Sequence, residues 1–312
     1  MAISAKPSIG WIGTGRMGFQ LASRLIEAGH NITIYNRTKA KAEPLIALGA
    51  KFVESPAELA GLDVVFIMVS ASKDLEQVTL GEHGVLSVPG KAPKILVDSS
   101  TVSAEVSAKV RAAAKAKECE FLAAPVSGNP AVIAAGKLTV AVSGPEAIFN
   151  EVAHLLNVFG HGITYVGEGE IARLVKIAHN VFLGIVTQAL AEITTLAEAG
   201  GVPRHAFLEF LNASVMGSPF SRYKSPAFVN LDFTPSFTLP LLFKDFTLGL
   251  EAAHEFHVPM PIASMTAQIV ESGIGAGYLE EDFSILLMEQ ARRAGMTLKS
   301  ENVKVLSGLG AE

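Results

Sequence analysis

The stretch that decides the fold lies near the N-terminus, where residues 9–39 read IGWIGTGRMGFQLASRLIEAGHNITIYNRTK. Its first four residues predict a short buried strand. Glycines then follow in the pattern G-x-G-x-x-G, and an amphipathic helix pattern runs to about Ala28 before a second apolar strand. This order of strand, glycine-rich turn, helix and strand is typical of a dinucleotide-binding domain.

The residues of the turn have separate expected tasks. Gly13 allows the tight turn, Gly15 lets backbone approach a pyrophosphate, and Gly18 lets the helix pack on the strand. The helix that begins with Arg16 and Met17 offers its N-terminal N–H groups and positive dipole end to the phosphates. We therefore expect these five residues to bind a nicotinamide dinucleotide.

The tip of the second strand predicts which dinucleotide is bound. An NAD enzyme usually has Asp or Glu there for the ribose 2′-hydroxyl, whereas this chain has Asn36, Arg37 and Thr38. A carboxylate would repel a 2′-phosphate, and a guanidinium can bind it with two hydrogen bonds. We expect NADP(H) to be preferred over NAD(H).

Length and composition indicate an ordered globular chain. It has 312 residues, 49% of them hydrophobic, which is enough for two domains with separate cores. A net charge of −5 without a dense run of Lys and Arg argues against nucleic acid or an anionic membrane as the main partner. Small anions, namely a cofactor and a carboxylate-bearing substrate, are the expected partners.

Cysteine usage and the N-terminus bear on the compartment. Cys119 is the only cysteine, so no internal disulfide can form and a reducing compartment suits the chain. Residues 1–8 lack the hydrophobic core of an export signal, and the uncharged stretch Ile177–Ala191 is too short to span a bilayer. We expect a cytoplasmic protein with no membrane partner and no metal site, and with Ile177–Ala191 in a buried helix.

Short apolar runs alternate with helical patterns through the first half of the chain. After the first unit these runs are Val64–Met68, Ile95–Val97, Phe121–Ala123, Val140–Val142 and Thr164–Val166. The alternation predicts an α/β fold with a doubly wound, mostly parallel sheet of the Rossmann type.

Beyond Val166 the sequence shows helical patterns and no convincing strand. They cover Leu174–Ala199, Arg204–Asn212, Lys244–Glu255 and Ile262–Ser272, and residues 217–219, 234–235 and 258–259 predict turns. We expect an NADP-binding Rossmann domain over residues 1–167. An all-helical domain for substrate binding and dimerisation is expected over residues 168–312, joined to the first by a long interdomain helix. A ligand would bind in the cleft at the carboxyl ends of the strands.

Polar groups follow two of the predicted strands. Val69 and Ser70 end one run, and Thr101 stands shortly after the next. Hydroxyl and backbone groups there can bind the ribose or carboxamide of the cofactor. The alternative is ordinary capping of the following helices, for which Ser103 is well placed.

A second candidate segment is APVSGNP at residues 124–130. Its successive backbone N–H groups and one hydroxyl can hold a carboxylate, so Ser127, Gly128 and Asn129 are candidate substrate-binding residues. A plain tight turn would use the same residue types.

The third candidate is Lys176 with Asn180, spaced to share one face of the long helix. In a cleft the ammonium of Lys176 would be partly desolvated, which lowers its pKa toward the range useful for proton transfer. Asn180 would hold the substrate or orient the lysine. The alternative is a lysine that extends from a helix end to solvent and an asparagine satisfied in the core.

These segments together resemble the β-hydroxyacid dehydrogenase family. Within it they are similar to 3-hydroxyisobutyrate dehydrogenases and to NADPH-using glyoxylate/succinic semialdehyde reductases. The resemblance covers nearly the whole chain. It rests on GWIGTGRMG (10–18) as the cofactor signature, APVSG (124–128) with GKL (136–138) as the substrate signature, the K-x-x-x-N of residues 176–180, and FKD (243–245).

The resemblance implies an activity and roles for these residues. Hydride would pass between nicotinamide and a small β-hydroxy acid or its semialdehyde, with Lys176 as general acid/base and Asn180 beside it. Lys244 would lie near cofactor and substrate, and Asp245 would fix its helix. The family also implies a homodimer or homotetramer.

The chain departs from the family pattern at two places. Asn129 stands where a second glycine is usual, so its side chain is expected to protrude into the carboxylate pocket. Gly167 and Gly169 lie farther before Lys176 than usual, which offers Arg173 as a rival at the commoner offset. We favour Lys176, because an arginine does not readily release a proton and Arg173 has no asparagine four residues on.

Two other functions are compatible with this architecture. One is reduction of imines, and the other is a catalytically silent NADP-binding protein. The presence of Lys176 favours alcohol and carbonyl chemistry over both.

Overall fold

The computed structural model describes residues 6–309, and the chain divides into two units, Met1–Lys176 and Ile177–Glu312. The division falls inside α7 (Ile171–Ala199), because this helix continues from one unit into the next. The boundary predicted after residue 167 lies just before the helix begins.

The first unit is built on a nine-stranded sheet, as far as residues 6–309 describe it. The strand order is β3-β2-β1-β4-β5-β6-β8-β7, with β9 beside β8. Pairing is parallel throughout except where β8 meets β6 and β7. The strands are β1 (Ile9–Ile12), β2 (Ile32–Tyr35), β3 (Lys51–Phe52), β4 (Val64–Ile67), β5 (Ile95–Asp98), β6 (Glu120–Ala123), β7 (Val126–Ser127), β8 (Leu138–Ser143) and β9 (Gly160–Gly167).

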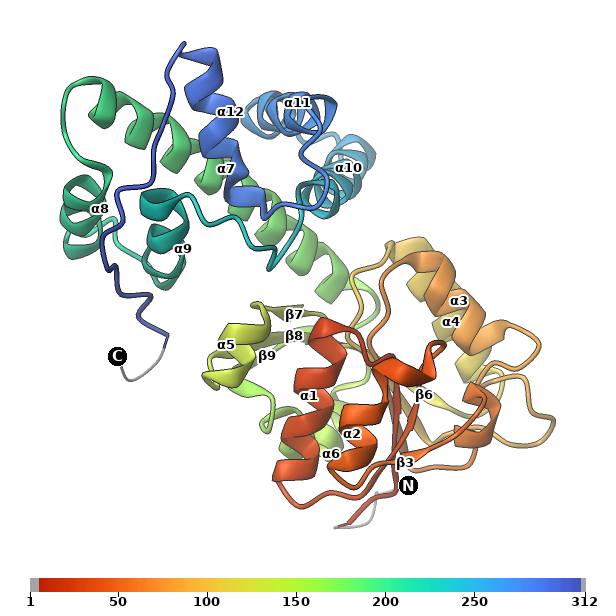
Figure 1. Cartoon of the computed structure of the whole chain (residues 1–312). Helices are drawn as coiled ribbons and strands as arrows, with labels where there is room; N and C mark the ends of the chain where they lie inside the picture. The colour runs from red at the N-terminus through yellow and green to blue at the C-terminus, as the bar shows by residue number, and fades with distance from the viewer. Residues whose placement is uncertain (1–5, 310–312) are drawn as a thin grey trace. The chain divides into compact units, whose positions relative to one another are not determined.

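Helices cover both faces of this sheet (Figure 1). Trp11 and Phe66 face a core shared with α1 and α6, whereas Ile12 and Val65 face a core shared with α3 and α4. Strands buried on both faces read as continuous apolar runs, which is why the sequence pattern was visible. The predicted Rossmann fold is confirmed. The helices of this unit are α1 (Arg16–Glu27), α2 (Glu43–Ala47), α3 (Ser72–Leu80), α4 (Ala104–Lys115), α5 (Pro130–Ala134) and α6 (Glu146–Leu156), with short 3₁₀ turns η1 (Lys39–Lys41) and η2 (Pro56–Leu59).

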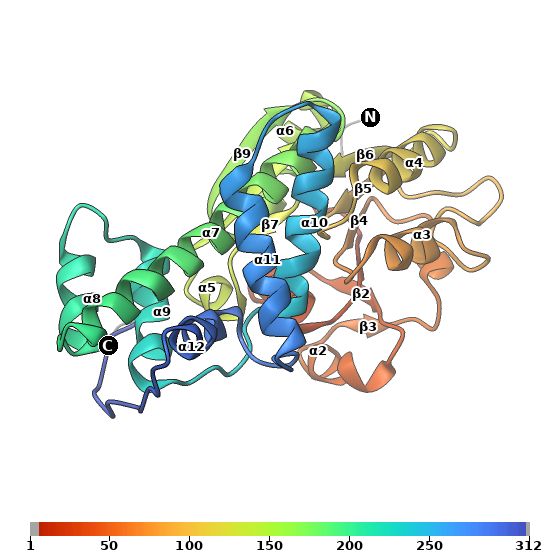
Figure 2. The same ribbon diagram turned by 90° about the horizontal axis from the view of Figure 1, so that it is seen from above.

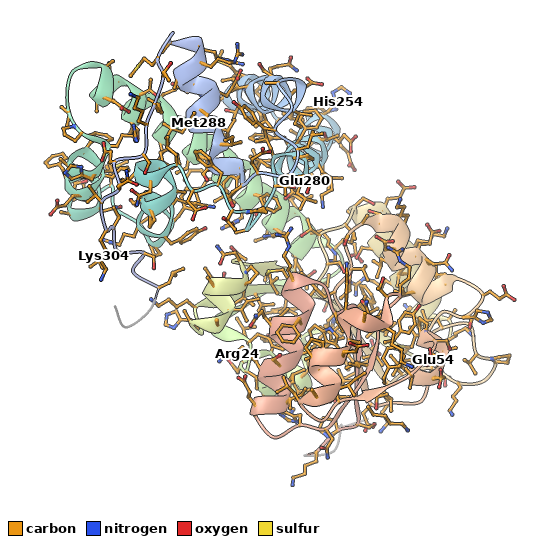
Figure 3. The ribbon with its side chains drawn as sticks, in the orientation of Figure 1. Arg24, Glu54, His254, Glu280, Met288 and Lys304 are labelled. Atoms are coloured by element: carbon orange, nitrogen blue, oxygen red, sulfur yellow. The ribbon has the colours of Figure 1, made fainter. Side chains whose placement is uncertain are left out.

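Arg24 ties the first helix to distant parts of this unit. Its guanidinium, labelled in Figure 3, donates hydrogen bonds to the carbonyl oxygens of Val158 at 2.6 Å and Ile133 at 3.4 Å. Arg24 therefore links α1 to the end of α5 and to the turn before β9.

The second unit is helical, and the predicted all-helical domain is confirmed. Its helices after α7 are α8 (Arg204–Ala213), α9 (Pro219–Asn230), α10 (Leu239–Glu255), α11 (Pro261–Gly275) and α12 (Leu286–Arg293), with the 3₁₀ turn η3 (Phe283–Ile285). Helices α10 and α11 lie side by side (Figure 2). Within residues 177–309 the only β pairing is the isolated bridge between Thr238 and Asp282.

The sequence missed two of these helices. The predicted turn at 217–219 is the start of α9, where Ser218 caps the helix through the N–H of Ser221 and Pro219 occupies the first turn. Helix α9 was hidden because it contains Pro226 and buries the polar residues Lys224 and Ser225, so its apolar period is weak. Helix α12 was missed for a related reason, since it is short and buries Glu289.

Helix α7 begins three residues before the predicted Leu174–Ala199 and ends at the predicted residue. The stretch Ile177–Ala191 is not the fully buried helix that was expected, since Phe182 is 64% exposed. Helix α7 spans 29 residues and is long and apolar enough to cross a membrane, with 44% of its most apolar window buried. A core helix of a folded domain passes the same test, so the length of α7 is weak evidence for a membrane span.

Candidate active site

The glycine-rich turn after β1 separates glycines that the fold needs from one that it does not. A Cβ on Gly13, whose φ is +96°, would lie 2.2 Å from the carbonyl oxygen of Met68, and a Cβ on Gly18 would lie 2.0 Å from that of Gly13. Gly15 has an ordinary φ of −66° and no atom within 4 Å of a Cβ built on it. Packing therefore explains Gly13 and Gly18, whereas nothing within the fold requires a glycine at position 15.

A dinucleotide pyrophosphate fits this position. Gly15 is the N-cap of α1 and makes no side-chain capping bond, so the helix N-terminus keeps its positive end open to an anion. Arg16 and Met17 begin the helix as expected. The turn supports the predicted phosphate contact on the evidence of its backbone alone.

The tip of β2 holds its asparagine and arginine differently. The side chain of Asn36 accepts a hydrogen bond from the N–H of Thr14 at 2.9 Å and donates one to the carbonyl oxygen of Thr38 at 2.8 Å. Asn36 thus joins the glycine-rich turn to the tip. Arg37 is 85% exposed and lies 3.3 Å from a carboxylate oxygen of Asp74. The guanidinium of Arg37 is therefore available at the surface beside the tip.

Hydroxyl groups after β5 cross-link the strand ends. Ser100 Oγ accepts from the N–H of Val69 at 2.9 Å and donates to Asp98 Oδ1 at 2.6 Å. Ser103 caps α4 through the N–H of Val106 at 3.3 Å, as the capping alternative predicted. Ser70 is exposed, and Val69 and Thr101 are partly exposed, so all three remain cofactor candidates along this edge.

The segment 124–130 forms β7, a turn and the start of α5. Gly128 has a φ of +143°, and a Cβ there would lie 2.8 Å from side-chain atoms of both Leu138 and Val132. Asn129 is the N-cap of α5, and its Oδ1 accepts from the N–H of Val132 at 2.9 Å. The carbonyl end of the Asn129 side chain thus turns toward α5, contrary to the expectation that the side chain protrudes into a pocket. Ser127 is the last residue of β7, and Gly128 follows it in the turn.

Arg173 is a structural residue. It is 2% exposed, and its guanidinium donates to Asp98 Oδ2 at 2.5 Å, to the carbonyl oxygen of Ser100 at 2.6 Å and to Ser107 Oγ at 3.1 Å. These bonds fix the first turn of α7 to the end of β5. Because the guanidinium is buried and occupied by these partners, Arg173 is removed as a rival to Lys176.

Asn180 is held by the aspartate of the FKD sequence. Its Nδ2 donates to Asp245 Oδ2, and both residues are almost fully buried. Asp245 Oδ1 accepts no hydrogen bond among the described residues, while Lys244 Nζ lies 3.4 Å from it. His179 Nδ1 lies 3.1 Å from Asn180 Oδ1. Asp245 therefore orients the asparagine that follows Lys176 by one helical turn.

Two glycines allow α7 and α10 to approach closely enough for this bond. A Cβ on Gly184 would lie 2.4 Å from the ring of Phe246, and a Cβ on Gly249 would lie 2.4 Å from Val181 Cγ2. Sequence reasoning did not use these residues. A glycine inside each of two apolar helices was the signal that could have identified the contact.

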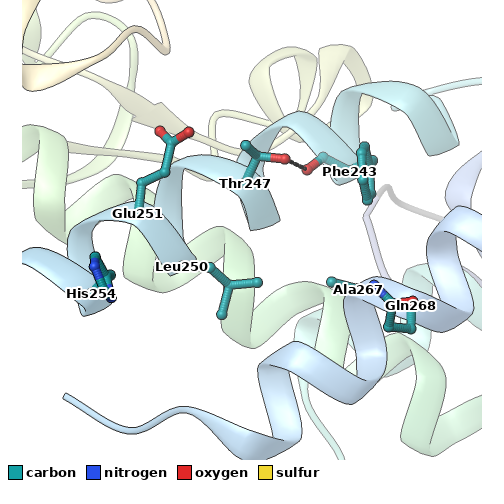
Figure 4. Close-up of a pocket in the computed structure, with 7 residues that line it drawn as sticks. All are labelled: Phe243, Thr247, Leu250, Glu251, His254, Ala267 and Gln268. Carbon is teal, nitrogen blue, oxygen red and sulfur yellow. Dashed lines mark hydrogen bonds between the residues drawn. The ribbon is translucent and has the colours of Figure 1, made fainter. Parts of the chain in front are cut away.

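A pocket of about 390 Å³ opens between α10 and α11 (Figure 4). Its lining consists of Phe243, Thr247, Leu250, Glu251, His254, Ala267 and Gln268. Phe243 of the FKD sequence lines this pocket, whereas none of the predicted site residues does.

The cysteine and the possible metal ligands add no further candidate site among the described residues. Burial raises the pKa of the Cys119 thiol to about 12, in agreement with a structural cysteine. Among residues 6–309, no group of three or more His, Cys, Asp or Glu side chains could hold a metal ion.

Comparison with known proteins agrees with this geometry. The profile of the NAD binding domain of 6-phosphogluconate dehydrogenase matches residues 8–167, and that of the NAD-binding domain of NADP-dependent 3-hydroxyisobutyrate dehydrogenase matches residues 169–289. Both profiles describe NAD-binding parts of dehydrogenases.

Individual relatives span nearly the whole chain. The 2-(hydroxymethyl)glutarate dehydrogenase of Eubacterium barkeri is 32% identical over 93% of this chain and 97% of its own length. The chloroplastic glyoxylate/succinic semialdehyde reductase 2 of Arabidopsis thaliana is 30% identical over 90% of this chain and 78% of its own. The crystal structure of 3-hydroxyisobutyrate dehydrogenase from Salmonella typhimurium superposes with a TM-score of 0.81 at 27% identity, covering 90% of this chain and 99% of that one. The chain therefore belongs to the β-hydroxyacid dehydrogenase family of NAD(P)-dependent oxidoreductases, which act on CH–OH groups.

Proposed function

We propose that this protein is an NADP(H)-dependent dehydrogenase or reductase of small β-hydroxy acids and their semialdehydes, with Lys176 as general acid/base. The observation that carries the proposal is the buried hydrogen bond from Asn180 to Asp245, one helical turn after Lys176. A buried carboxylate that holds an amide in one orientation is an arrangement expected of a reaction site.

The bound nicotinamide supplies the hydride acceptor or donor. Lys176 takes the proton of the substrate hydroxyl during oxidation and returns a proton to the carbonyl oxygen during reduction. Asn180 positions the reacting group, and Asp245 keeps the Asn180 amide from rotating. A lysine suits this task because an ammonium can release its proton, which a guanidinium does not.

The carboxylate of the substrate is assigned to Ser127 and Gly128, and Lys244 is kept as a proposed substrate-binding residue. The backbone turn at Gly128, which its positive φ and close packing reserve for glycine, supports this assignment. Asn129 contributes by capping α5. The named substrates of the relatives, a hydroxymethyl acid and two aldehydes, support the substrate class.

The exposed guanidinium of Arg37 and the lack of Asp or Glu at the tip of β2 support preference for NADP(H). We further propose a cytoplasmic homodimer or homotetramer. Its support is an apolar face of α7 on which Phe182 is 64% exposed and Leu196 is 73% exposed, at spacings that fit a second copy.

The test is the initial rate of NADPH oxidation with glyoxylate, succinic semialdehyde, methylmalonate semialdehyde, tartronate semialdehyde and a cyclic imine. We expect turnover of one aldehyde and a fall in kcat of about 10²- to 10⁴-fold in Lys176→Ala. Lys176→Arg is the matched variant, since it keeps the charge and should lose activity to a similar extent. Lys115→Ala, a change on the exposed part of α4, is the control.

The other outcomes separate the competing functions. Turnover of the imine alone would indicate an imine reductase. Full activity in Lys176→Ala would show that another group moves the proton. NADPH binding without turnover of any aldehyde would indicate a protein that binds the cofactor without catalysis.

A further inference from the structure

A carboxylate lies against the arginine that is expected to bind the 2′-phosphate. Asp74, in the first turn of α3, places Oδ1 3.3 Å from Arg37 Nη1. The side chain of Arg37 is 85% exposed and that of Asp74 is 21% exposed. The tip of β2 has no acidic residue of its own, yet the fold brings one to it from a helix 37 residues away in sequence.

The neighbouring polar groups at the tip already have partners. Asn36 is occupied by the backbone of Thr14 and Thr38. Lys39 Nζ lies 2.9 Å from Glu54 Oε1, whose residue is labelled in Figure 3, and 4.9 Å from the ring centre of Phe52. Asp74 is therefore the carboxylate that the fold pairs with Arg37.

We propose that Asp74 is a cofactor-specificity residue. It weakens the binding of the 2′-phosphate of NADP(H) to Arg37 and so reduces the preference for NADP(H) over NAD(H). This inference rests on the proposed NADP(H) function. A 2′-phosphate that reaches Arg37 either displaces Asp74 or shares the guanidinium with it. In the first case an ion pair is lost, and in the second two anions lie beside one cation.

Binding of NAD(H) neither breaks the Arg37–Asp74 ion pair nor brings a second anion beside it. The 2′-hydroxyl of NAD(H) carries no charge and can donate a hydrogen bond to a carboxylate, which is the task of the acidic residue at the tip of β2 in NAD enzymes. Asp74 thus supplies from α3 the carboxylate that β2 lacks. Because the guanidinium of the pair is exposed to solvent, the expected effect on NADPH affinity is modest, about fivefold.

The test is the dissociation constant of NADPH and of NADH, measured by nicotinamide fluorescence without substrate. The variants are Asp74→Asn, Arg37→Gln and the double variant. Glu54→Gln is the control, because it removes the carboxylate of a neighbouring ion pair, that with Lys39. We expect Asp74→Asn to tighten NADPH about fivefold and to leave NADH unchanged or weaker. In the Arg37→Gln background the gain should shrink, and Glu54→Gln should leave the ratio of the two constants unchanged.

The results separate this inference from the function beneath it. If wild type prefers NADPH and Arg37→Gln removes the preference, but Asp74→Asn leaves the ratio unchanged or weakens NADPH, the role of Asp74 is wrong and the NADP(H) function stands. If Arg37→Gln leaves the ratio unchanged, Arg37 does not bind the phosphate, and both the assigned preference and the role of Asp74 are wrong.

Discussion

Two buried aspartates each hold one residue of α7, on either side of Lys176. Asp98 holds Arg173, in the turn before the lysine, and Asp245 holds Asn180, in the turn after it. Arg173 spreads donors over a carboxylate, a hydroxyl and a backbone carbonyl, whereas Asn180 gives Asp245 a single hydrogen bond. The first pair anchors the helix, and the second orients one amide.

The comparison teaches that sequence spacing from the lysine does not distinguish a residue that anchors the helix from the proposed partner of Lys176. Arg173 and Asn180 are both polar residues in an apolar helix, at helical offsets from Lys176. What differs is the partner. Several hydrogen bonds hold the Arg173 guanidinium in place beside Asp98. Asp245, in contrast, keeps one buried carboxylate oxygen that accepts no hydrogen bond among the described residues.

The largest expected effect comes from breaking the anchor. Arg173→Met leaves Asp98 buried without its cation and should lower the free energy of unfolding of the first unit by about 3–5 kcal/mol. Trp11, the only tryptophan and fully buried in this unit, reports the transition by its fluorescence in urea. The double variant with Asp98→Leu should recover part of the loss. A cost below about 1 kcal/mol in the single variant would contradict the anchoring role.

Breaking the orienting pair should cost activity more than stability. Asp245→Ala frees the Asn180 amide, and kcat should fall about 10²-fold through loss of orientation. Both residues lie in the second unit, and its unfolding, measured by circular dichroism in urea, should change little. Asp245→Asn keeps an acceptor for Asn180 and should restore part of kcat, a recovery that a merely structural role would not produce. Equal activity in the alanine variant and wild type would remove Asp245 from the site.

The close approach of α7 and α10 can be tested in the second unit, which contains Val181 and Gly249. A methyl group at Gly249 would lie 2.4 Å from Val181, so Gly249→Ala should destabilise the second unit by about 2 kcal/mol, measured by circular dichroism in urea. Gly275→Ala is the control, since Gly275 lies in α11 with no atom near its Cβ position. The interpretation is wrong if both variants behave alike.

The smallest effect concerns the buried carboxylate of Glu289, which binds Arg292 and Arg293. Hydrogen bonds from Arg292 lower the pKa of the buried Glu289 to about 2, with further bonds from Ser272 and Arg293. The pKa is depressed on folding, so this stabilisation is present above the ordinary glutamate pKa of about 4.5 and is lost as pH falls toward 2.

Glu289→Gln should therefore flatten the loss of stability between pH 4.5 and 2 by about 1 kcal/mol, because the exposed arginines are screened by solvent. Unfolding in urea at several pH values in this window measures the slope. An unchanged slope would show that Glu289 contributes nothing to the acid dependence.

The sequence by itself determined the elements whose signal is local. A buried parallel strand needs a continuous apolar run, a tight turn with positive φ needs a glycine, and a phosphate site needs a helix N-terminus. Residues 9–39 therefore specified β1, α1 and β2 to within a residue or two, and Gly13, Gly15 and Gly18 took the positions expected of them. Lys176 and Asn180 on one helix followed from the helical period in the same way.

Only the tertiary structure decided which polar side chains meet. The partners of Arg173, Asn180 and Arg37 are Asp98, Asp245 and Asp74, each more than 30 residues away in sequence. Helix packing and strand order bring these pairs together, and neither leaves a periodic trace in the sequence. For the same reason α9 escaped prediction, because Lys224 and Ser225 are buried by contacts that only the folded unit supplies. Neighbouring residues determine the local geometry of strands, turns and helices, whereas the pairing of buried charges depends on the packing of the whole unit.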